Sequence, residues 1–252
     1  MELVLPEYAK YVYEINCLRL SVAKVLGHRD ALKYHICRYI ELDYMLKVGA
    51  LEYKQCLIEN KVEKAKRMLY YLQDGNAKPE ALPELIKKEF EEKDQKAVIM
   101  GDAINNAIDM SLEKIPTEEE ITELNSHYLV LLRDYSPELN IKNGEEEKTL
   151  FEEIQKAYIL CDLKAIKKYE KLKKEELFFD ELEEYKKEKI RLQELLSNTN
   201  KEIAKIKNTF PYTEKLSIQD ENLFRRRKET INARTNELED ELKLLQNELR
   251  KF

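Results

Sequence analysis

The side chains in this sequence that could do chemistry are three histidines, four cysteines and many carboxylates. His28, His35 and His127 show none of the His/Glu spacings typical of zinc enzymes, and no pair of acids stands out as a general acid and base. Phosphate-binding glycine loops and serine-nucleophile motifs are also missing from the sequence. We therefore expect a protein that is not an enzyme and that uses no metal and no cofactor. The three histidines are expected at a helix end or on helix surfaces.

The cysteines are too scattered to suggest a shared site. Cys17, Cys37, Cys56 and Cys161 form no CxxC pair, so their spacing argues against a zinc site and against a disulfide framework. Such thiols are typical of buried side chains in a reducing compartment. We therefore expect buried free thiols and a cytoplasmic location.

One basic cluster, Arg225 to Lys228, could contact phosphate groups. It lies in a Glu-rich helical segment, and the net charge of −6 argues against a general nucleic-acid-binding protein, which needs a cationic surface. A solvated helix face is the better interpretation of this cluster. No segment reaches the roughly 18 apolar residues of a membrane span, and the first residues lack the pattern of a secretory signal. We expect no membrane association.

The elements that carry these residues are predicted to be helices. The chain has 252 residues, of which 37 % are charged and only 5 are Gly and 6 are Pro, so it has few residues suited to turns. A β protein needs many turns, whereas long helices need few. The sequence predicts an all-α, elongated protein with long helical hairpins.

The first of three predicted regions covers residues 1–116. Apolar residues at steps of three and four predict a helix over 7–26 that ends at Gly27, followed by a much longer helix over about 29–73. Pro79 and Pro83 open a third helix that continues to about Glu113. The length of the second helix is typical of a coiled-coil-like arm.

The last region, 177–252, has the clearest periodicity. A first apolar series runs from Phe178 to Phe210, and a second recurs every seven residues from Phe224 to Phe252. Such heptads bury a narrow apolar stripe against a partner helix. With a short Pro-containing turn between them, the two series predict an antiparallel coiled-coil hairpin. The periodicity leaves open whether the seam also pairs with a second chain in a homo-oligomer.

The middle region, 117–176, predicts two antiparallel helices joined by a rigid loop. Thr117 and Glu120 form a capping box, and the helix that starts there must end before Pro137. The loop leads to Glu145–Glu147, which are favourable in the first turn of a second helix. We expect the apolar faces of the two helices to pack on each other.

This middle region resembles a J domain, the module of DnaJ-like co-chaperones. The likeness rests on seven positions in the two helices, which are Tyr128, Leu131, Tyr135, Phe151, Ile154, Ala157 and Tyr158. In the family, a His-Pro-Asp loop between these helices contacts the ATPase domain of a heat-shock chaperone. Here Ser136, Pro137 and Glu138 stand at the loop positions, so only the proline is kept.

The resemblance implies a partner-binding surface at Ser136, Pro137, Glu138 and the adjacent Arg133. The preceding helix is acidic where the family presents a cationic face, because Arg133 is its one basic residue apart from His127. We therefore expect a J-like co-chaperone or adaptor for a heat-shock ATPase and client proteins that lacks normal stimulation of the ATPase. The alternatives are a coiled-coil scaffold without a chaperone role and an ordinary tight turn at residues 136–138.

Overall fold

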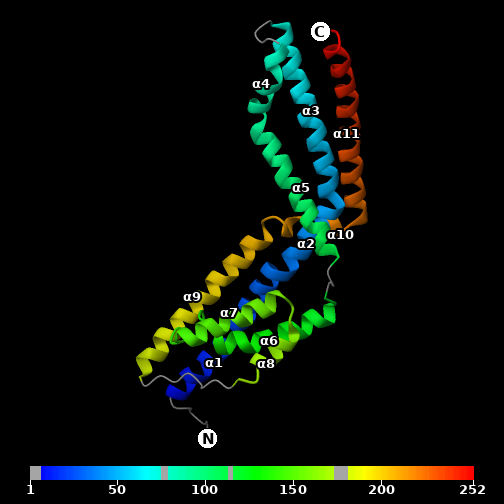
Figure 1. Ribbon diagram of the computed structural model, residues 1–252. Coiled ribbons are helices and arrows are strands. Elements are labelled where there is room, and N and C mark those ends of the chain that lie inside the picture. Colours follow the sequence, from blue (N-terminus) through cyan, green and yellow to red (C-terminus); the bar gives the residue numbers. More distant parts are fainter. Residues whose placement is uncertain (1–6, 75–78, 113–115, 173–180) are drawn as a thin grey trace. The chain divides into compact units, whose positions relative to one another are not determined.

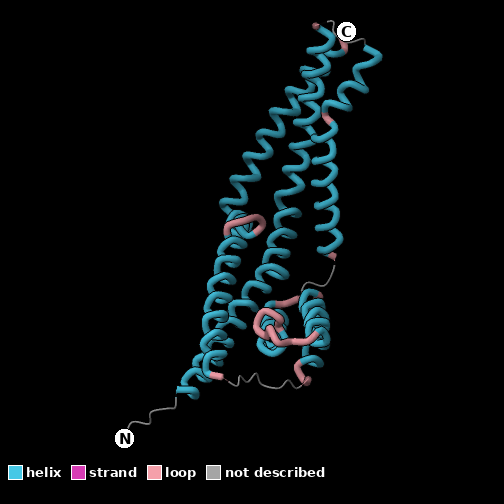
Figure 2. The backbone as a smooth tube through the Cα atoms, turned by 90° about the vertical axis from the view of Figure 1, so that its left-hand side faces the viewer, coloured by secondary structure: helices cyan, strands magenta, loops and turns pink. Residues whose placement is uncertain are grey.

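The computed structural model describes residues 7–74, 79–112, 116–172 and 181–252 (Figure 1). These residues fold into helices joined by loops and turns, and none of them belongs to a strand (Figure 2). The prediction of an all-α protein is therefore confirmed. Within the described ranges, no helix combines the length and the apolar character that crossing a bilayer requires.

The chain forms two compact units, and each is built from two separate stretches of sequence. The first comprises 1–38 and 115–213, and the second comprises 39–114 and 214–252. The boundary after Arg38 lies within α2 (Cys37–Tyr44), and the boundary after Thr213 lies within the short turn η4 (Tyr212–Glu214). These units differ from the three consecutive regions that we predicted, 1–116, 117–176 and 177–252.

In the first unit, two long helices run side by side in the same direction. They are α1 (Glu7–Ala31) and α9 (Leu182–Lys207). Glu14 forms an ion pair with Lys189 at 2.7 Å, and Arg29 forms one with Glu202 at 3.5 Å. Because residue numbers rise together along both helices, the pair is parallel.

Three shorter helices complete the first unit: α6 (Glu118–Tyr135), α7 (Glu145–Ile159) and α8 (Leu163–Tyr169). Helix α6 contacts α1, α7 and α8, so it holds the central position among them. One continuous apolar core joins these helices, with Val22 and Leu26 from α1 and Leu192 from α9 buried in it. Burial of this core is the main favourable contribution to folding of the unit.

Gly27 lies inside α1, so the prediction that this residue ends the first helix is wrong. Helix α1, the π-helical turn η1 (Leu32–Ile36), α2, the π-helical turn η2 (Met45–Gly49) and α3 (Ala50–Gln73) follow one another without a loop. A Cβ atom on Gly27 would lie 3.4 Å from Cδ1 of Leu132. That is an ordinary van der Waals distance, so Gly27 is an interior residue of α1 that faces α6, not a helix end.

The second unit is organised around α3. This helix contacts α11 (Glu221–Leu249) and a segment formed by η3 (Pro79–Ala81), α4 (Leu82–Glu89) and α5 (Glu91–Ser111). The predicted third helix is thus interrupted at Phe90, and Glu113 lies outside the described residues. The short helix α10 (Lys215–Gln219) precedes α11.

The heptad seam of α11 packs on α3. Ile58 and Val62 of α3 form a cluster with Leu238, and Leu242 and Leu245 pack against this cluster. Arg227 pairs with Glu52 and Lys66 pairs with Glu241, so α3 and α11 are also parallel. The predicted antiparallel hairpin of residues 177–252 is therefore wrong.

The partner of each C-terminal helix is a parallel helix from the first third of the chain. Buried positions of the first apolar series include Tyr185, Leu192 and Ile203 on α9, whereas Phe210 is exposed and Phe178 lies outside the described residues. Positions of both series pack against another helix, α1 for the first and α3 for the second, whereas Phe252 at the end of the second series is exposed.

Candidate functional site

The start and the end of α6 follow from single residues. Thr117 Oγ1 accepts a hydrogen bond from the Glu120 amide at 3.2 Å, and Glu120 Oε2 accepts one from the Thr117 amide at 2.9 Å, which confirms the capping box. Ser136 leaves the helical conformation with φ −56° and ψ 126°, because the following Pro137 excludes the helical region. Helix α6 therefore ends at Tyr135, directly before the loop.

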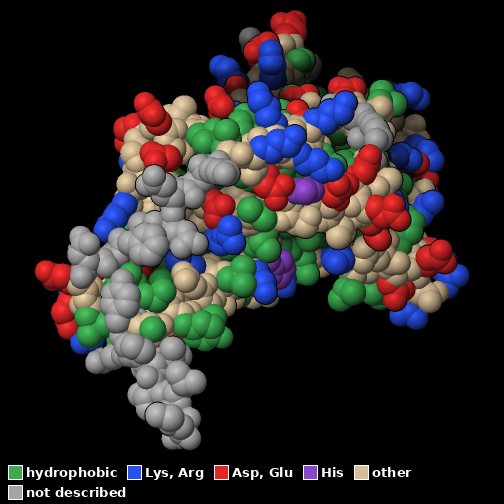
Figure 3. All heavy atoms as spheres, turned by 90° about the horizontal axis from the view of Figure 1, so that it is seen from below, with side chains coloured by type: hydrophobic (Ala, Val, Ile, Leu, Met, Phe, Trp, Pro, Cys, Tyr) green, Lys and Arg blue, Asp and Glu red, His purple; other side chains and the backbone are tan. Residues whose placement is uncertain are grey.

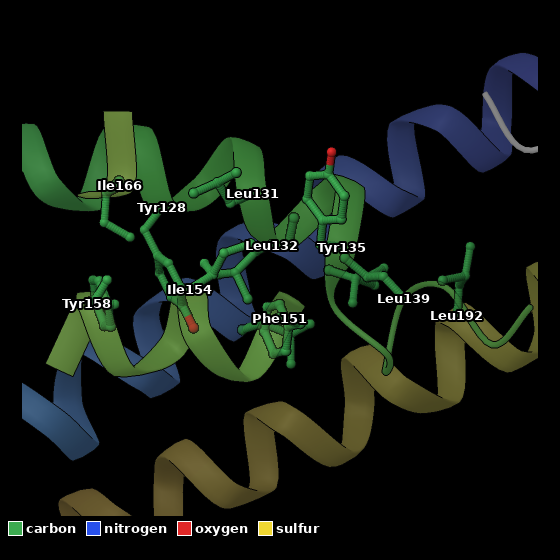
Figure 4. Packing of buried hydrophobic residues seen from close by; sticks show 14 of the residues in the cluster. Tyr128, Leu131, Leu132, Tyr135, Leu139, Phe151, Ile154, Tyr158, Ile166 and Leu192 are labelled. Atoms are coloured by element: carbon green, nitrogen blue, oxygen red, sulfur yellow. The ribbon is translucent and has the colours of Figure 1, made fainter. Parts of the chain in front are cut away.

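Helices α6 and α7 are held together by an apolar interface (Figure 4). The seven residues on which the resemblance rests are all buried, with exposed fractions of 8 % or less. The rings of Tyr128 and Tyr158 stack with centroids 3.7 Å apart and planes 10° from parallel. Figure 4 shows Ile154 of α7 lying between α7 and α6.

The loop after α6 bends back on itself through backbone hydrogen bonds. The Ser136 carbonyl accepts bonds from the amides of Leu139 and Asn140 at 3.1 and 2.9 Å. The Asn140 side-chain nitrogen donates to the carbonyls of Arg133 and Ser136, each at 3.1 Å. Ser136 is fully buried and its hydroxyl has no partner, whereas Pro137 is half-buried. Leu139 is also fully buried, so the first turn of the loop is anchored at Ser136 and at Leu139.

Three arginines of the same unit, Arg19, Arg29 and Arg191, bind this loop, and we call them the arginine clamp. Arg29 on α1 donates to both carboxylate oxygens of Glu138, at 3.0 and 2.8 Å. Such bidentate pairing fixes the orientation of the carboxylate as well as its position. Glu138 is therefore engaged by its own chain although its side chain is 41 % exposed.

The other two arginines of the clamp bind the loop backbone. Arg19 on α1 donates to the Leu139 carbonyl at 2.9 Å, and Arg191 on α9 donates to the carbonyls of Glu138 and Leu139 at 2.8 and 3.2 Å. Arg19 also donates to the side-chain oxygen of Asn140 at 2.5 Å. Both arginines contact the buried carboxylate of Glu188, which offsets part of their charge.

A buried carboxylate lies next to the clamp. Asp30 is 1 % exposed and accepts hydrogen bonds from Arg29 at 2.9 Å and from the Tyr128 hydroxyl at 3.0 Å. Burial raises the pKa of Asp30, and its contacts with Arg29 and Tyr128 offset only part of this effect. Burial alone would lower the pKa of Arg29, but its bonds to Glu138 and Asp30 outweigh burial and raise it. The clamp thus connects the loop electrostatically to the core of the hairpin.

The predicted partner-binding residues do not form a common exposed surface. Ser136 is buried, Glu138 is paired with Arg29, and the Arg133 side chain points to Asp134, with Nε and Oδ1 2.7 Å apart. The arrangement can hold a helical hairpin against α1 and α9. It offers few uncommitted polar groups to a second protein at the loop.

Sequence reasoning missed the arginines of the clamp. Arg19 follows Ile15 by four residues and precedes Val22 by three, so it lies along the buried stripe of its helix. A cation on an apolar stripe is a usable signal for an internal ion pair or hydrogen bond. The sequence does not indicate that the acceptors are carbonyls of a loop 120 residues away.

Two other groups of candidate residues differ from expectation. His35 is buried rather than on a helix surface, while His127 is partly exposed and lies 2.6 Å from Glu170. His28 is exposed in the last turn of α1, which continues directly into η1. All four cysteines are free, but only Cys37 is buried, so the expectation of buried thiols is wrong for the others.

The basic cluster at residues 225–228 is partly used inside the second unit. Arg227 forms ion pairs with Glu52 at 2.8 Å and Glu214 at 2.6 Å and contacts the Tyr44 hydroxyl at 3.0 Å. Arg225, Arg226 and Lys228 are exposed. On the face shown in Figure 3, basic and acidic side chains are interspersed, as expected for a solvated surface.

Comparison of the chain with protein-family models, with curated proteins and with solved structures found no match in any of the three.

Proposed function

We propose that this chain is a non-enzymatic adaptor of the J-domain type whose loop is held by its own unit, so that it does not stimulate a heat-shock ATPase. The observation that carries this proposal is the arginine clamp on residues 138 and 139. It occupies the carboxylate of Glu138, one of the residues that the J-domain likeness assigns to the ATPase partner. The proposed partners are a heat-shock chaperone, bound weakly or in another orientation, and client proteins.

The hairpin core supports the J-type part of the proposal. Tyr128, Leu131, Phe151, Ile154 and Tyr158 pack between α6 and α7 with almost no exposure. Burial of large side chains at this density gives one well-defined arrangement of the two helices. A rigid hairpin with a proline-containing tip is the framework that the resemblance implies.

The charge of α6 supports the absence of stimulation. Its first turn carries Glu118, Glu119 and Glu120, and Arg133 is the basic residue of its last turn. A partner surface that is itself acidic would meet this helix with like charge, which slows association and weakens binding. Lys167 is paired with Glu123, so it neutralises only one acid of the helix.

The direct test is a measurement of ATP turnover by a heat-shock chaperone from the same organism. It uses the natural chain, the variant Ser136→His/Glu138→Asp, and this variant combined with Arg29→Ala. Because Ser136 is fully buried, circular dichroism must first show that the helices persist in both variants. We expect no stimulation by the natural chain and a gain of stimulation in the variant that also lacks Arg29.

Two results would overturn the proposal in different ways. Stimulation by the natural chain would show that the clamp does not block the loop. Folded variants that neither stimulate nor bind the chaperone would remove the J-type interpretation and leave a structural role.

A structural scaffold without a chaperone role is the second candidate. The parallel α3–α11 pair favours it, because its seam is already filled by residues of the same chain, including Ile58, Val62 and Leu238. A scaffold of this kind presents helix surfaces rather than a seam to its partners. Light scattering tests it: association driven by the α11 seam requires α3 to be displaced, so a monomer is expected at micromolar concentration.

A further inference from the structure

Three exposed lysines form a row along α8 and the turn that follows it, and we call them the lysine row. Lys164 and Lys168 are four residues apart and Lys171 follows after three more, so all three lie on one side of the helix. The backbone keeps turning past the end of α8, because the Lys171 amide donates to the Lys168 carbonyl at 3.3 Å. With a rise of about 1.5 Å per residue, the row is about 10 Å long.

The other sides of α8 are occupied by its own unit. Ile166 is fully buried in the apolar core, on the side of the helix opposite the lysine row. Lys167 pairs with Glu123 of α6. The Tyr169 hydroxyl donates to Glu153 of α7 at 3.2 Å. The lysine row is therefore the face of α8 that the described elements leave open to solvent.

The lysine row lacks the acids that neutralise lysines elsewhere in the chain. In other helices, lysines pair with an acid three or four residues away, and examples are Lys47 with Asp43, Lys148 with Glu145, Lys186 with Glu183 and Lys243 with Asp240. Within the row, the neighbours at these spacings are other lysines, which repel one another. Among the described residues, no carboxylate forms an ion pair with any lysine of the row.

The helix dipole explains only part of this arrangement. Cations are favourable at the C-terminal end of a helix, which accounts for Lys168 in the last turn of α8 and for Lys171 just after it. Lys164 lies in the first turn, where a cation is unfavourable, and that turn contains no acid. A row that includes Lys164 therefore lowers the stability of the isolated chain, and an anionic partner would offset this loss.

An exposed leucine lies near each end of the lysine row. Leu160, the C-cap residue of α7, is 75 % exposed, and Leu172 is 48 % exposed. Leu160 precedes Lys164 by four residues, and Leu172 directly follows Lys171. A partner that covered the row and both its ends would also remove these two apolar side chains from water, which favours binding.

The surroundings of the row select the kind of anionic partner. Helices α6 and α7 both contact α8 and both begin with three glutamates. A bilayer or a nucleic-acid duplex extends far beyond 10 Å and would meet these acids with like charge. Bidentate contacts to phosphate need arginine, and α8 has none. A short segment with carboxylates matches both the length and the charge of the row.

We propose that the lysine row is a docking surface for a short acidic segment of another protein. The carboxylates of the segment pair with the three lysines, and apolar residues at its ends contact Leu160 and Leu172. The lysine row and the loop at residues 136–139 lie on different elements, so this docking surface does not depend on the proposed J-type function.

The test is fluorescence anisotropy of a labelled synthetic oligoglutamate peptide with a leucine at each end, titrated with the full-length protein. Lys164→Gln/Lys168→Gln/Lys171→Gln should weaken binding about 10-fold or more at low salt. Leu160→Ser should weaken it about threefold, because less apolar surface is covered. Binding by the natural protein should weaken as salt increases. The changed side chains are exposed, so the variants should keep their helices, which circular dichroism checks.

The matched control is Arg225→Gln/Arg226→Gln/Lys228→Gln, which removes the same number of exposed cations from the second unit. It should change the affinity for the peptide by less than about twofold. Vesicles that contain phosphatidylserine and a DNA duplex represent the other anionic partners, and neither should displace the peptide.

Four results would contradict the docking surface. They are absence of peptide binding by the natural protein at low salt, unchanged binding by the variant of the lysine row, equal losses in this variant and in the matched control, and displacement of the peptide by vesicles or DNA.

Discussion

The loop region of the first unit and the α3–α11 pair of the second unit are stabilised in opposite ways. The loop is held by arginines that are themselves largely buried and that donate to backbone carbonyls and to carboxylates. The α3–α11 pair is held by an apolar seam, and its charged pairs, such as Lys66 with Glu241, lie on the exposed flanks. The same residue types thus contribute to structure in one region and mainly to solubility in the other.

This difference follows from what each backbone needs. The helices of the α3–α11 pair satisfy their own amides and carbonyls, so side chains need only to cover an apolar stripe. The loop leaves carbonyls at residues 138 and 139 without backbone partners, and these must be satisfied by side chains when they are covered. Arginine suits this role because one guanidinium can serve two acceptors.

The largest effect should come from removing a side chain in the hairpin core. Ile154 is fully buried in the large core, and Ile154→Ala should lower the free energy of unfolding of the first unit by about 3–5 kcal/mol. Leu238→Ala, in the smaller α3–α11 cluster, should lower that of the second unit by about 2–3 kcal/mol, because its neighbours Leu242 and Leu245 are only partly buried. Urea unfolding with hydrogen exchange assigns each loss to its unit. Equal losses of unfolding free energy for the two variants would contradict the expectation that the hairpin core contributes more than the α3–α11 cluster.

Arg29→Ala should give the next largest effect. The substitution removes the cation next to Asp30 and the bidentate partner of Glu138. The free energy of unfolding should therefore fall by about 2–4 kcal/mol. This loss is smaller than for a fully buried ion pair because Glu138 is partly exposed. The matched change Lys66→Ala breaks an exposed pair of the α3–α11 flank and should cost less than about 1 kcal/mol. Both are measured by urea unfolding at low and at high salt. Similar losses for the two variants would show that the clamp is only a surface feature.

The sequence predicts one of these two regions better than the other. Apolar spacing placed Phe151 and Tyr158 on one face of a helix, because the period of a helix determines which residues share a face, and the J-domain likeness added Tyr128 on the facing helix. The same spacing identified the seam of α11 but could not identify α3 as its partner, since a heptad specifies a stripe and not the helix that covers it.

The residues that sequence reasoning missed depend on contacts between distant segments. The clamp joins Arg19 to a loop carbonyl 120 positions away, and backbone acceptors have no signature in a sequence. Gly27 was taken for a helix end because glycine often has this role, whereas here it lies inside α1, which continues into η1 without a loop. Both errors come from tertiary packing that overrides a local preference.

A pH titration sharpens the description of the clamp. Because burial raises the pKa of Asp30 in the folded protein, the folded state retains a proton that the unfolded state has already released. The contribution of Asp30 to the free energy of unfolding therefore falls as pH rises from the ordinary pKa of an aspartate, about 3.9, to its value in the folded protein. Asp30→Asn should remove this slope. The free energy of unfolding of both proteins is measured across that range. A value for the natural protein that rises with pH relative to that of the variant would contradict the burial effect.

The smallest expected effect separates two glycines, one in each unit, that both lie inside helices. Gly27→Ala should raise the free energy of unfolding by about 0.5–1 kcal/mol, because alanine is the better helix former and its Cβ would meet Leu132 at an ordinary 3.4 Å. In α5, a Cβ on Gly101 would lie 3.1 Å from the Tyr53 hydroxyl, so Gly101→Ala must displace that side chain. At Gly101, the stability gained from the higher helix propensity of alanine should be cancelled or reversed. Thermal melting of the two variants measures the contrast, and a stabilising Gly101→Ala would mean that the helix contact in the second unit is looser than the contact between α1 and α6.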